Sequence, residues 1–333
     1  MPFRTDPIRT WSPRLSTRSK RRFDDDDYPI PHRPLDQPLD QPFITEPETD
    51  DADNDADEPS FSSYADAAHG PLPAPDWVIT AASAIDVDLG VMKSGKEADV
   101  SLLRRSNGDQ EVLLAVKRYR DAKHRLFHRD AGYLEGRRLE GRNARRSREL
   151  RAMRTRTGFG RELIAGQWAT AEFAVLSRLW QMGAAVPYPV QLSGTELMME
   201  FIGDPDGTAA PRLAQERPDR RQAERLFAQL REVLLVVAEA GYAHADLSPY
   251  NILVHHSEND KSENGRSENG RTASDSRLVL IDVPQAIDLV RNPHGFEFLR
   301  RDCVNVCTWF EARGIHADVD DLYNTLMGTV PMA

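Results

Sequence analysis

Cysteines, long apolar runs and a leading apolar segment are scarce or lacking in this chain of 333 residues. The only cysteines, Cys303 and Cys307, lie four apart in a segment with helical spacing, where a disulfide is geometrically disfavoured and a metal would lack further ligands. We therefore expect buried, reduced thiols. No run approaches the roughly 18 apolar residues of a membrane span, and no apolar stretch follows the N-terminal arginines. These absences predict a cytoplasmic protein without a membrane segment.

Charge is strongly segregated along the chain, so its net value of −10 describes no single part of it. Residues 1–75 are rich in Pro, Asp and Ser, a composition that buries too little apolar surface to offset chain entropy. We predict a disordered acidic tail there. Residues 118–161 carry fifteen Lys or Arg against five acids with weak periodicity, which predicts a flexible basic insertion.

Between these segments, apolar periodicity predicts ordered strands and helices. A hairpin is expected where two apolar runs flank the turn "SNGDQ", and a helix where apolar residues recur three and four apart up to Gly183. A loop is expected after this helix, followed by one strand that ends near Phe201. The expected elements are the strands 97–104 and 111–117, the helix 168–182, a long helix 219–240, and two short helices, 299–313 and 318–328.

The polar tract 257–276 contains the pentad SENGR twice and separates the apolar runs "NILV" and "RLVLIDV". Surface loops absorb insertions at small cost in loop-closure entropy. We therefore expect two paired strands joined by an expanded, disordered hairpin tip.

A loop of small residues between Gly90 and Lys96 raises the question of phosphate binding. The spacing satisfies G-x-x-x-x-G-K, which opens a Walker A loop, but Glu97 stands where Ser or Thr would bind magnesium. The following residues alternate like a strand, whereas a P-loop leads into a helix. A loop between two strands that covers phosphates from above is the better interpretation.

Such a loop requires a lysine near the end of the following strand pair and an acid on the next helix to hold it. Lys117 ends "LLAVK", which is close to the V-A-I-K signature. Glu172 lies on the apolar side of the helix 168–182, where an unpaired carboxylate is costly. We predict that Lys117 and Glu172 form an ion pair that directs the lysine toward the phosphates of ATP.

The segment "GYAHADLSPYNILV" supplies the remaining groups. His244, Asp246, Leu247 and Asn251 match the kinase-like pattern H-x-D-L-x-x-x-N, in which the Asp faces the nucleophilic hydroxyl and the Asn reaches a metal. "LVLIDV" then ends on Asp282, where a second metal-binding carboxylate is required. Four elements in this order are unlikely to coincide by chance.

From about residue 80 to 325 the chain resembles the RIO family of atypical serine/threonine kinases. The motifs are "SGKEADV", "LAVKRYR", "MEFIG", "HADLSPYNILV", "IDVPQAID" and "HGFEFLRRDCVNV", of which "IDVPQ" replaces the D-F-G of ordinary kinases. The resemblance implies an α+β, two-lobed kinase-like fold of the trimmed type, without an activation loop. The N-lobe would span 76–203 with the insertion 118–161, and the C-lobe 204–333 with the insertion 257–276.

The resemblance also implies an ATP- and magnesium-dependent kinase, with manganese as an alternative metal, that phosphorylates itself or works as an ATPase switch. Asp246 would be the catalytic acid/base, Asn251 and Asp282 the metal ligands, and Asp282 also a site of aspartyl phosphate. Ser147, Thr155 and Thr157 would be autophosphorylation sites. The residues implied to bind ATP are Ser94, Lys96, Glu97, Val100, Lys117, Glu172, Met199, Glu200, Phe201 and Ile202.

Two alternatives stay open on the sequence. Small-molecule phosphotransferases also use H-x-D-L-x-x-x-N, although only 51 residues follow Asp282 here to hold such a substrate. A kinase-like module could instead dock on RNA or a ribosome through the basic insertion. One departure from the family pattern is Ala245, which occupies a position that is usually Gly and is expected to be tolerated.

Overall fold

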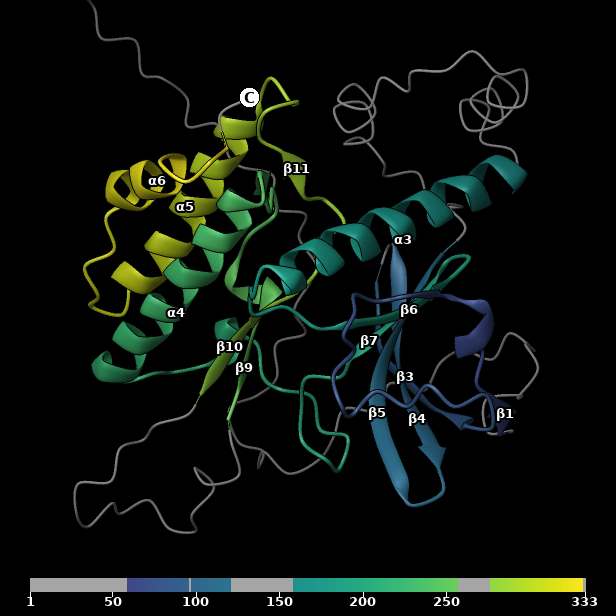
Figure 1. Ribbon diagram of the computed structural model, residues 1–333. Helices are drawn as coiled ribbons and strands as arrows, with labels where there is room; N and C mark the ends of the chain where they lie inside the picture. The colour runs from purple at the N-terminus through teal and green to yellow at the C-terminus, as the bar shows by residue number, and fades with distance from the viewer. Residues whose placement is uncertain (1–58, 96, 121–157, 257–275, 332–333) are drawn as a thin grey trace, which may run out of the picture. The chain divides into compact units, whose positions relative to one another are not determined.

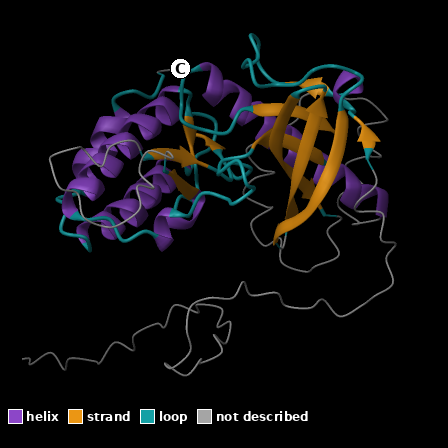
Figure 2. Ribbon diagram, turned by 90° about the horizontal axis from the view of Figure 1, so that it is seen from below, coloured by secondary structure: helices purple, strands orange, loops and turns teal. Residues whose placement is uncertain are grey.

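The computed structural model describes residues 59–331, apart from Lys96 and the ranges 121–157 and 257–275. Most of the acidic tail, most of the basic insertion and nearly all of the SENGR tract therefore lie outside the described residues. Within the described part, most strands gather in one group, and the helices nearest the C-terminus gather in another (Figure 2). No helix of this part is long and apolar enough to cross a membrane.

A seven-stranded antiparallel sheet forms the first of these groups, in the order β1-β3-β4-β5-β7-β6-β2. Its centre is the predicted hairpin, which turns at Gly108 with a φ of +61°, a conformation that glycine adopts without steric cost. The strands are β1 (Ser60–Phe61), β2 (Ala68–His69), β3 (Ile85–Ser94), β4 (Ala98–Asn107), β5 (Gln110–Tyr119), β6 (Pro189–Ser193) and β7 (Glu196–Glu200).

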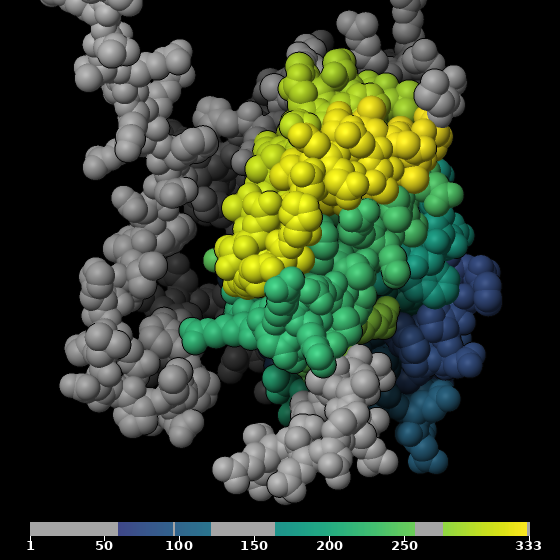
Figure 3. Space-filling model, turned by 90° about the vertical axis from the view of Figure 1, so that its left-hand side faces the viewer, coloured from purple at the N-terminus to yellow at the C-terminus, as the bar shows by residue number. Residues whose placement is uncertain are grey.

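The described residues also form the helices α3 (Gly158–Gln181), α4 (Arg220–Glu239), α5 (Gly295–Glu311) and α6 (Val319–Met327). Helix α3 contacts the sheet, whereas α4, α5 and α6 pack on one another (Figure 1). Helix α6, drawn in yellow, lies directly against α4 in the space-filling view (Figure 3). The side chain of Asp219 caps the N-terminus of α4. The apolar face of α4 packs in the largest core cluster. Cys303 and Cys307 belong to the same cluster and are buried free thiols, as predicted.

Two small antiparallel ladders are formed by strands that lie between α4 and α5 in the chain, and they carry the loops of the candidate site. Strand β9 (Ile252–His255) pairs with β10 (Arg277–Leu280), which confirms the predicted pairing of "NILV" with "RLVL". Strand β8 (Tyr242–Ala243) pairs with β11 (Ile287–Asp288). Short 3-10 turns, η1 (Tyr64–Asp66), η2 (Leu213–Gln215) and η3 (Pro249–Asn251), complete the elements.

The ordered sheet begins earlier than the sequence predicted. The predicted tail boundary at residue 75 is wrong, because β1 and β2 both precede it and belong to the sheet. Burial explains the difference: Tyr64 is buried in a core cluster with Tyr188, and the hydroxyl of Tyr188 donates to the carbonyl of Pro71 at 3.0 Å. The sequence gives no signal for these few contacts, because small and polar residues surround Tyr64 in the chain.

Other element boundaries also differ from the predictions. The segment expected to be one strand ending near Phe201 is a hairpin, β6–β7, because Gly194 adopts a φ of +58° and reverses the chain. Helix α3 begins ten residues before the predicted start, inside the expected insertion, and β5 extends to Tyr119 at the insertion's other end. Helix α5 begins at Gly295 rather than 299.

A buried ion pair and the hydrogen bonds around it link three strands of the sheet to Ser63. Both nitrogens Nε and Nη2 of the fully buried Arg105 donate to the carboxylate of Asp86, at 2.7 and 2.8 Å, and Nη1 donates to Gln191 at 3.0 Å. Gln191 in turn donates to the hydroxyl of Ser63 at 2.9 Å. Because buried charges are stable only when paired, this network fixes β3, β4 and β6 to one another and holds residue 63 against them.

Replacing Arg105 by Met should lower the free energy of unfolding by about 3–5 kcal/mol, because Asp86 would be left charged and buried without a partner. Urea unfolding at neutral pH measures the loss. The double variant R105M/D86L should be more stable than R105M alone. The control is R104M, whose partner Glu111 lies 3.8 Å away at the surface and whose loss should cost about 0.5 kcal/mol or less. Equal losses for R104M and R105M would contradict this assignment.

Candidate nucleotide and metal site

The predicted ion pair between Lys117 and Glu172 is present. The Nζ atom of Lys117, on β5, lies 2.9 Å from Oε1 of Glu172 on α3. The same Nζ atom lies 2.7 Å from Oδ1 of Asp282, which follows β10. Three segments that are far apart in the sequence therefore meet at one ammonium group.

Burial makes this cluster a strongly coupled one. Lys117 is 9% exposed and Glu172 is 1% exposed. Burial alone would lower the pKa of Lys117, but the adjacent carboxylates of Glu172 and Asp282 outweigh it and raise that pKa above its ordinary value. The hydroxyl of Tyr119 donates to the other oxygen of Glu172, and burial beside that carboxylate raises the pKa of Tyr119. Lys117 is thus held as a cation.

Asp282 is the more accessible of the two carboxylates, with 39% of its side chain exposed. Burial of its environment alone would raise its pKa, but the ammonium of Lys117 holds the pKa of Asp282 below its ordinary value. Its backbone has a φ of +64°, a conformation that is uncommon for any residue with a side chain. Asp282 is therefore an ionised carboxylate presented on a strained turn.

The segment around Asp246 forms a tight loop that is fixed from both sides. The side-chain amide of Asn251 donates to the carbonyl of Asp246 at 2.8 Å, and the amide of Ile281 donates to the carbonyl of Asn251 at 3.0 Å. The second bond places Asn251 beside the residue that precedes Asp282. With its nitrogen engaged, Asn251 presents Oδ1 as the atom available to a cation.

The backbone on the other side of Asp246 is held by α5. The carboxylate of Asp302 accepts the amide of Ala245 at 2.8 Å and the amide of Leu247 at 3.1 Å. Asn305 donates to the carbonyl of Leu247 at 2.9 Å, and Arg301 donates to the carbonyl of Ala245. Burial raises the pKa of Asp302, while His244 and the two amides oppose that rise.

Asp302 and its neighbours on α5 were missed from the sequence. A signal was present, because Asp302 lies beside Leu299, Cys303 and Val306 on the buried face of α5. A carboxylate on an apolar helix face calls for a partner, which is the reasoning that selected Glu172. The partners of Asp302 are backbone amides, however, and no pattern of side chains in the sequence predicts them.

The predicted adenine segment, Met199–Ile202, leaves β7 and enters a small apolar cluster. Ile202 is buried there with Ala210 and Val279, and Leu253 and Ile281 pack against them. Within the segment, the amide of Glu200 donates to the carbonyl of Tyr188, and the carbonyl of Ile202 accepts from Ala210. A purine would therefore have to use other backbone groups of the segment.

The phosphate loop is the turn between β3 and β4. Gly90 lies inside β3 and a strand follows the turn, so the Walker A alternative is excluded. Val100 on β4 is paired with Lys117, whereas the hydroxyl of Ser94 lies near Arg120 and Asp99. Glu97 accepts the amide of Arg120 through its carbonyl. Lys96 lies outside the described residues.

A magnesium ion fits the oxygen atoms gathered here. Within the described part of the chain, no group of three His, Cys, Asp or Glu side chains could hold a metal. Magnesium does not need one, because it is usually bound by one or two carboxylates together with substrate phosphates and waters. The predicted ligands Asn251 and Asp282 would supply such a partial set, and the Nζ atom of Lys117 lies 2.7 Å from Oδ1 of Asp282.

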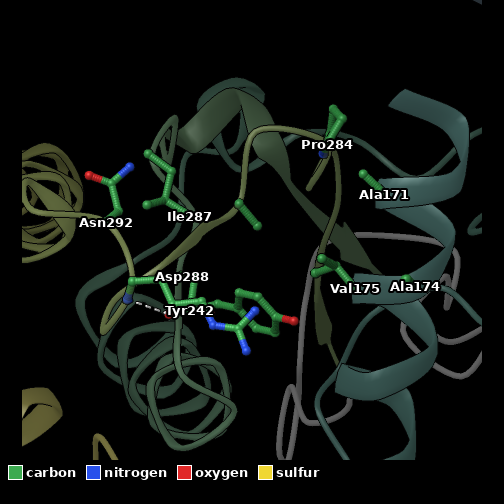
Figure 4. A pocket seen from close by; sticks show the side chains of 10 residues that line it. Ala171, Ala174, Val175, Tyr242, Pro284, Ile287, Asp288 and Asn292 are labelled. Atoms are coloured by element: carbon green, nitrogen blue, oxygen red, sulfur yellow. Dashed lines mark hydrogen bonds and ion pairs between the residues drawn. The ribbon is translucent and has the colours of Figure 1, made fainter. Parts of the chain in front are cut away.

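A separate cavity of about 180 Å³ lies behind α3 and is not this site (Figure 4). Ala171, Ala174 and Val175 of α3 form one wall, and residues between Pro284 and Asn292 face them. None of the residues predicted to bind ATP or metal lines it.

A sheet lysine paired to a helix carboxylate, opposite a loop with Asp and Asn and a strand-end Asp, is the arrangement with which protein kinases hold ATP. The fold places this chain in the same class. The two-lobed α+β type of that fold is found in the Rio2 kinase from Chaetomium thermophilum, solved as an ADP/Mg²⁺-phosphoaspartate complex. The two structures superpose with a TM-score of 0.51 at 21% identity, over 73% of this chain and 60% of that one.

A family model described as the RIO domain matches residues 114–259 and 272–322. The RIO-type serine/threonine-protein kinase Rio1 of Haloferax volcanii is 33% identical over 246 residues, which are 73% of this chain and 70% of that protein. The serine/threonine-protein kinase RIO1 of Caenorhabditis elegans is 31% identical over 68% of this chain, but only 37% of that protein is covered. The chain belongs to the RIO family of serine/threonine-protein kinases.

Ala245 is the one family departure that the structure makes testable, because its φ is +67°. The left-handed conformation costs an L-residue about 1–2 kcal/mol, and glycine would not incur this cost. Glycine loses more chain entropy on folding than alanine, however, which offsets about 0.4–1 kcal/mol of the gain. We expect A245G to raise the free energy of unfolding by about 0.5–1 kcal/mol in urea. The exposed Ala312, with a φ of −61°, is the control, and A312G should lower the free energy of unfolding. A loss of stability in A245G would contradict the strain assigned to Ala245.

Proposed function

We propose that this chain transfers the γ-phosphate of ATP in a magnesium-dependent reaction, either to a hydroxyl or carboxylate of its own or to water. The observation that carries the proposal is the position of the Lys117 Nζ atom within 3 Å of both Glu172 and Asp282. An ammonium group held in place by two carboxylates is preorganised for phosphate, so it needs no reorganisation when charge develops on the transferring group.

Each remaining group has a role set by its position. Bound magnesium would neutralise charge on the phosphates, and manganese suits the same oxygen ligands, Asn251 and Asp282. Asp246 would accept the proton of the attacking hydroxyl, and the bonds from Asn251 and Asp302 hold its loop rigid. The apolar cluster around Ile202 would receive adenine.

The acceptor of the phosphate, where it is not water, would lie within the chain itself. Between Asp282 and the start of α5 at Gly295, the chain forms only the short strand β11, which leaves little structure there to bind a separate protein substrate. Transfer within the chain suits this short connection, and the solved Rio2 kinase contains a phosphoaspartate. We propose Asp282 as the first candidate acceptor. The predicted serine and threonine sites, Ser147, Thr155 and Thr157, lie outside the described residues.

Replacing Asp246 by Asn should lower ATP turnover by about 10²–10⁴-fold, because a general base contributes that much to proton transfer. Nucleotide affinity should stay within a few-fold of the wild type, since Asp246 is not predicted to bind ATP. Release of phosphate from labelled ATP, with magnesium or manganese, and calorimetric ATP binding measure the two quantities. Unchanged turnover in D246N would contradict the proposal.

The same labelled chain shows where the phosphate goes. Label on Asp282 would be an acyl phosphate and would be released by hydroxylamine, whereas label on Ser or Thr would survive that treatment. Label in neither place, with phosphate appearing in solution, would identify an ATPase. Each result selects one of the acceptors named above, and D282N serves as the control for the first.

A further inference from the structure

The residue directly before Ser94 lies on the same face of the sheet as the predicted phosphate-binding lysine. Lys93 of β3 is paired with Val100 of β4, and Val100 is paired with Lys117 of β5. Side chains of directly paired residues project from the same face of a sheet. Lys93, Val100 and Lys117 therefore form one row across three strands, and Lys117 reaches Asp282 from that face.

The resemblance to the family pointed to Ser94 rather than to Lys93. Ser94 is paired with Asp99, one step along the strands, so its side chain projects from the opposite face. Its hydroxyl lies 3.4 Å from Arg120, which also forms an ion pair with Asp99 on that face. Of the two neighbours, only Lys93 directs its side chain toward the nucleotide side of the sheet.

Lys93 belongs to a cluster of cations that has too few anions. Its pKa is lowered, first by partial burial and then by the positive charge of Arg212, with a smaller contribution from Lys117, although Asp282 opposes the shift. Lys117 already pairs with Asp282. Among the described residues, neither Lys93 nor Arg212 forms an ion pair. Like charges held together without counter-charges favour the binding of an anion.

Arg212 belongs to a different segment of the chain, and it is close enough to Lys93 for its positive charge to lower the pKa of that lysine. It precedes η2, and its backbone forms a bridge with Leu253 of β9. Leu253 is two residues from Asn251, and it packs against the same apolar cluster as Ile281, the residue before Asp282. Lys93 and Arg212 thus come from two separate segments of the chain, β3 and the residues before η2.

We propose that Lys93 and Arg212 form a second cationic contact for the phosphate chain of the nucleotide, in addition to Lys117. The inference rests on the proposed function, since it names further binding residues of the same site. Arginine suits phosphate through its paired N–H donors, and lysine acts as a point charge. Their charges would have little effect on a ligand that lacks phosphate.

The test compares the affinities of the full chain for ATP, ADP and adenosine by calorimetry in magnesium. Loss of a charged contact costs about 1.5–3 kcal/mol, so K93Q and R212Q should each weaken ATP binding by about 10- to 100-fold. ADP should be weakened less, and adenosine should be unaffected. K93R should retain most of the wild-type affinity for ATP.

The matched control is R104Q, because Arg104 lies on the same face of β4, four residues and about 13 Å along the strand from Val100. It removes one positive charge from the sheet and should leave all three affinities unchanged. ATP binding by the wild type with an unchanged affinity in K93Q would overturn this inference alone. Equal losses for ATP and adenosine would overturn it too. A wild-type chain that binds no ATP would overturn the proposed function together with it.

Discussion

The ammonium group of Lys117 is the point on which the rest of the site depends. A buried cation must be paired, and its partners come from α3 and from the turn after β10. Residues 117, 172 and 282 therefore cannot move independently. The sheet, the helix that covers it and the candidate metal-binding turn are held together by one set of charges, which is also the set that phosphate and magnesium would meet.

Backbone strain is the second constraint, and it is concentrated beside the same charges. Ala245 and Asp282 are the only residues other than glycine with positive φ in the described chain. Each is next to or part of a predicted catalytic segment, and Asp302 ties the first of them to α5 through two amides. Strain of this kind persists only where the surrounding structure enforces it, and it often marks functional sites.

The sequence predicted the central features because they depend on local patterns and on charge. The alternation of apolar and polar residues predicted the β4–β5 hairpin, and the energetic cost of an unpaired carboxylate identified Glu172 as the partner of Lys117. It missed what depends on backbone contacts made at long range, such as β1, β2 and the amide bonds to Asp302. It also did not single out Lys93, because a motif does not state which face of a strand a residue occupies.

A double-mutant cycle on Lys117 and Glu172 tests the central claim most directly. If Glu172 acts by holding Lys117, then K117M and the double variant K117M/E172Q should lose ATP turnover, measured as kcat/KM, by the same factor. E172Q alone should lose part of that factor. A double variant whose loss equals the product of the two single losses would show that Glu172 and Lys117 act independently, and would contradict the account.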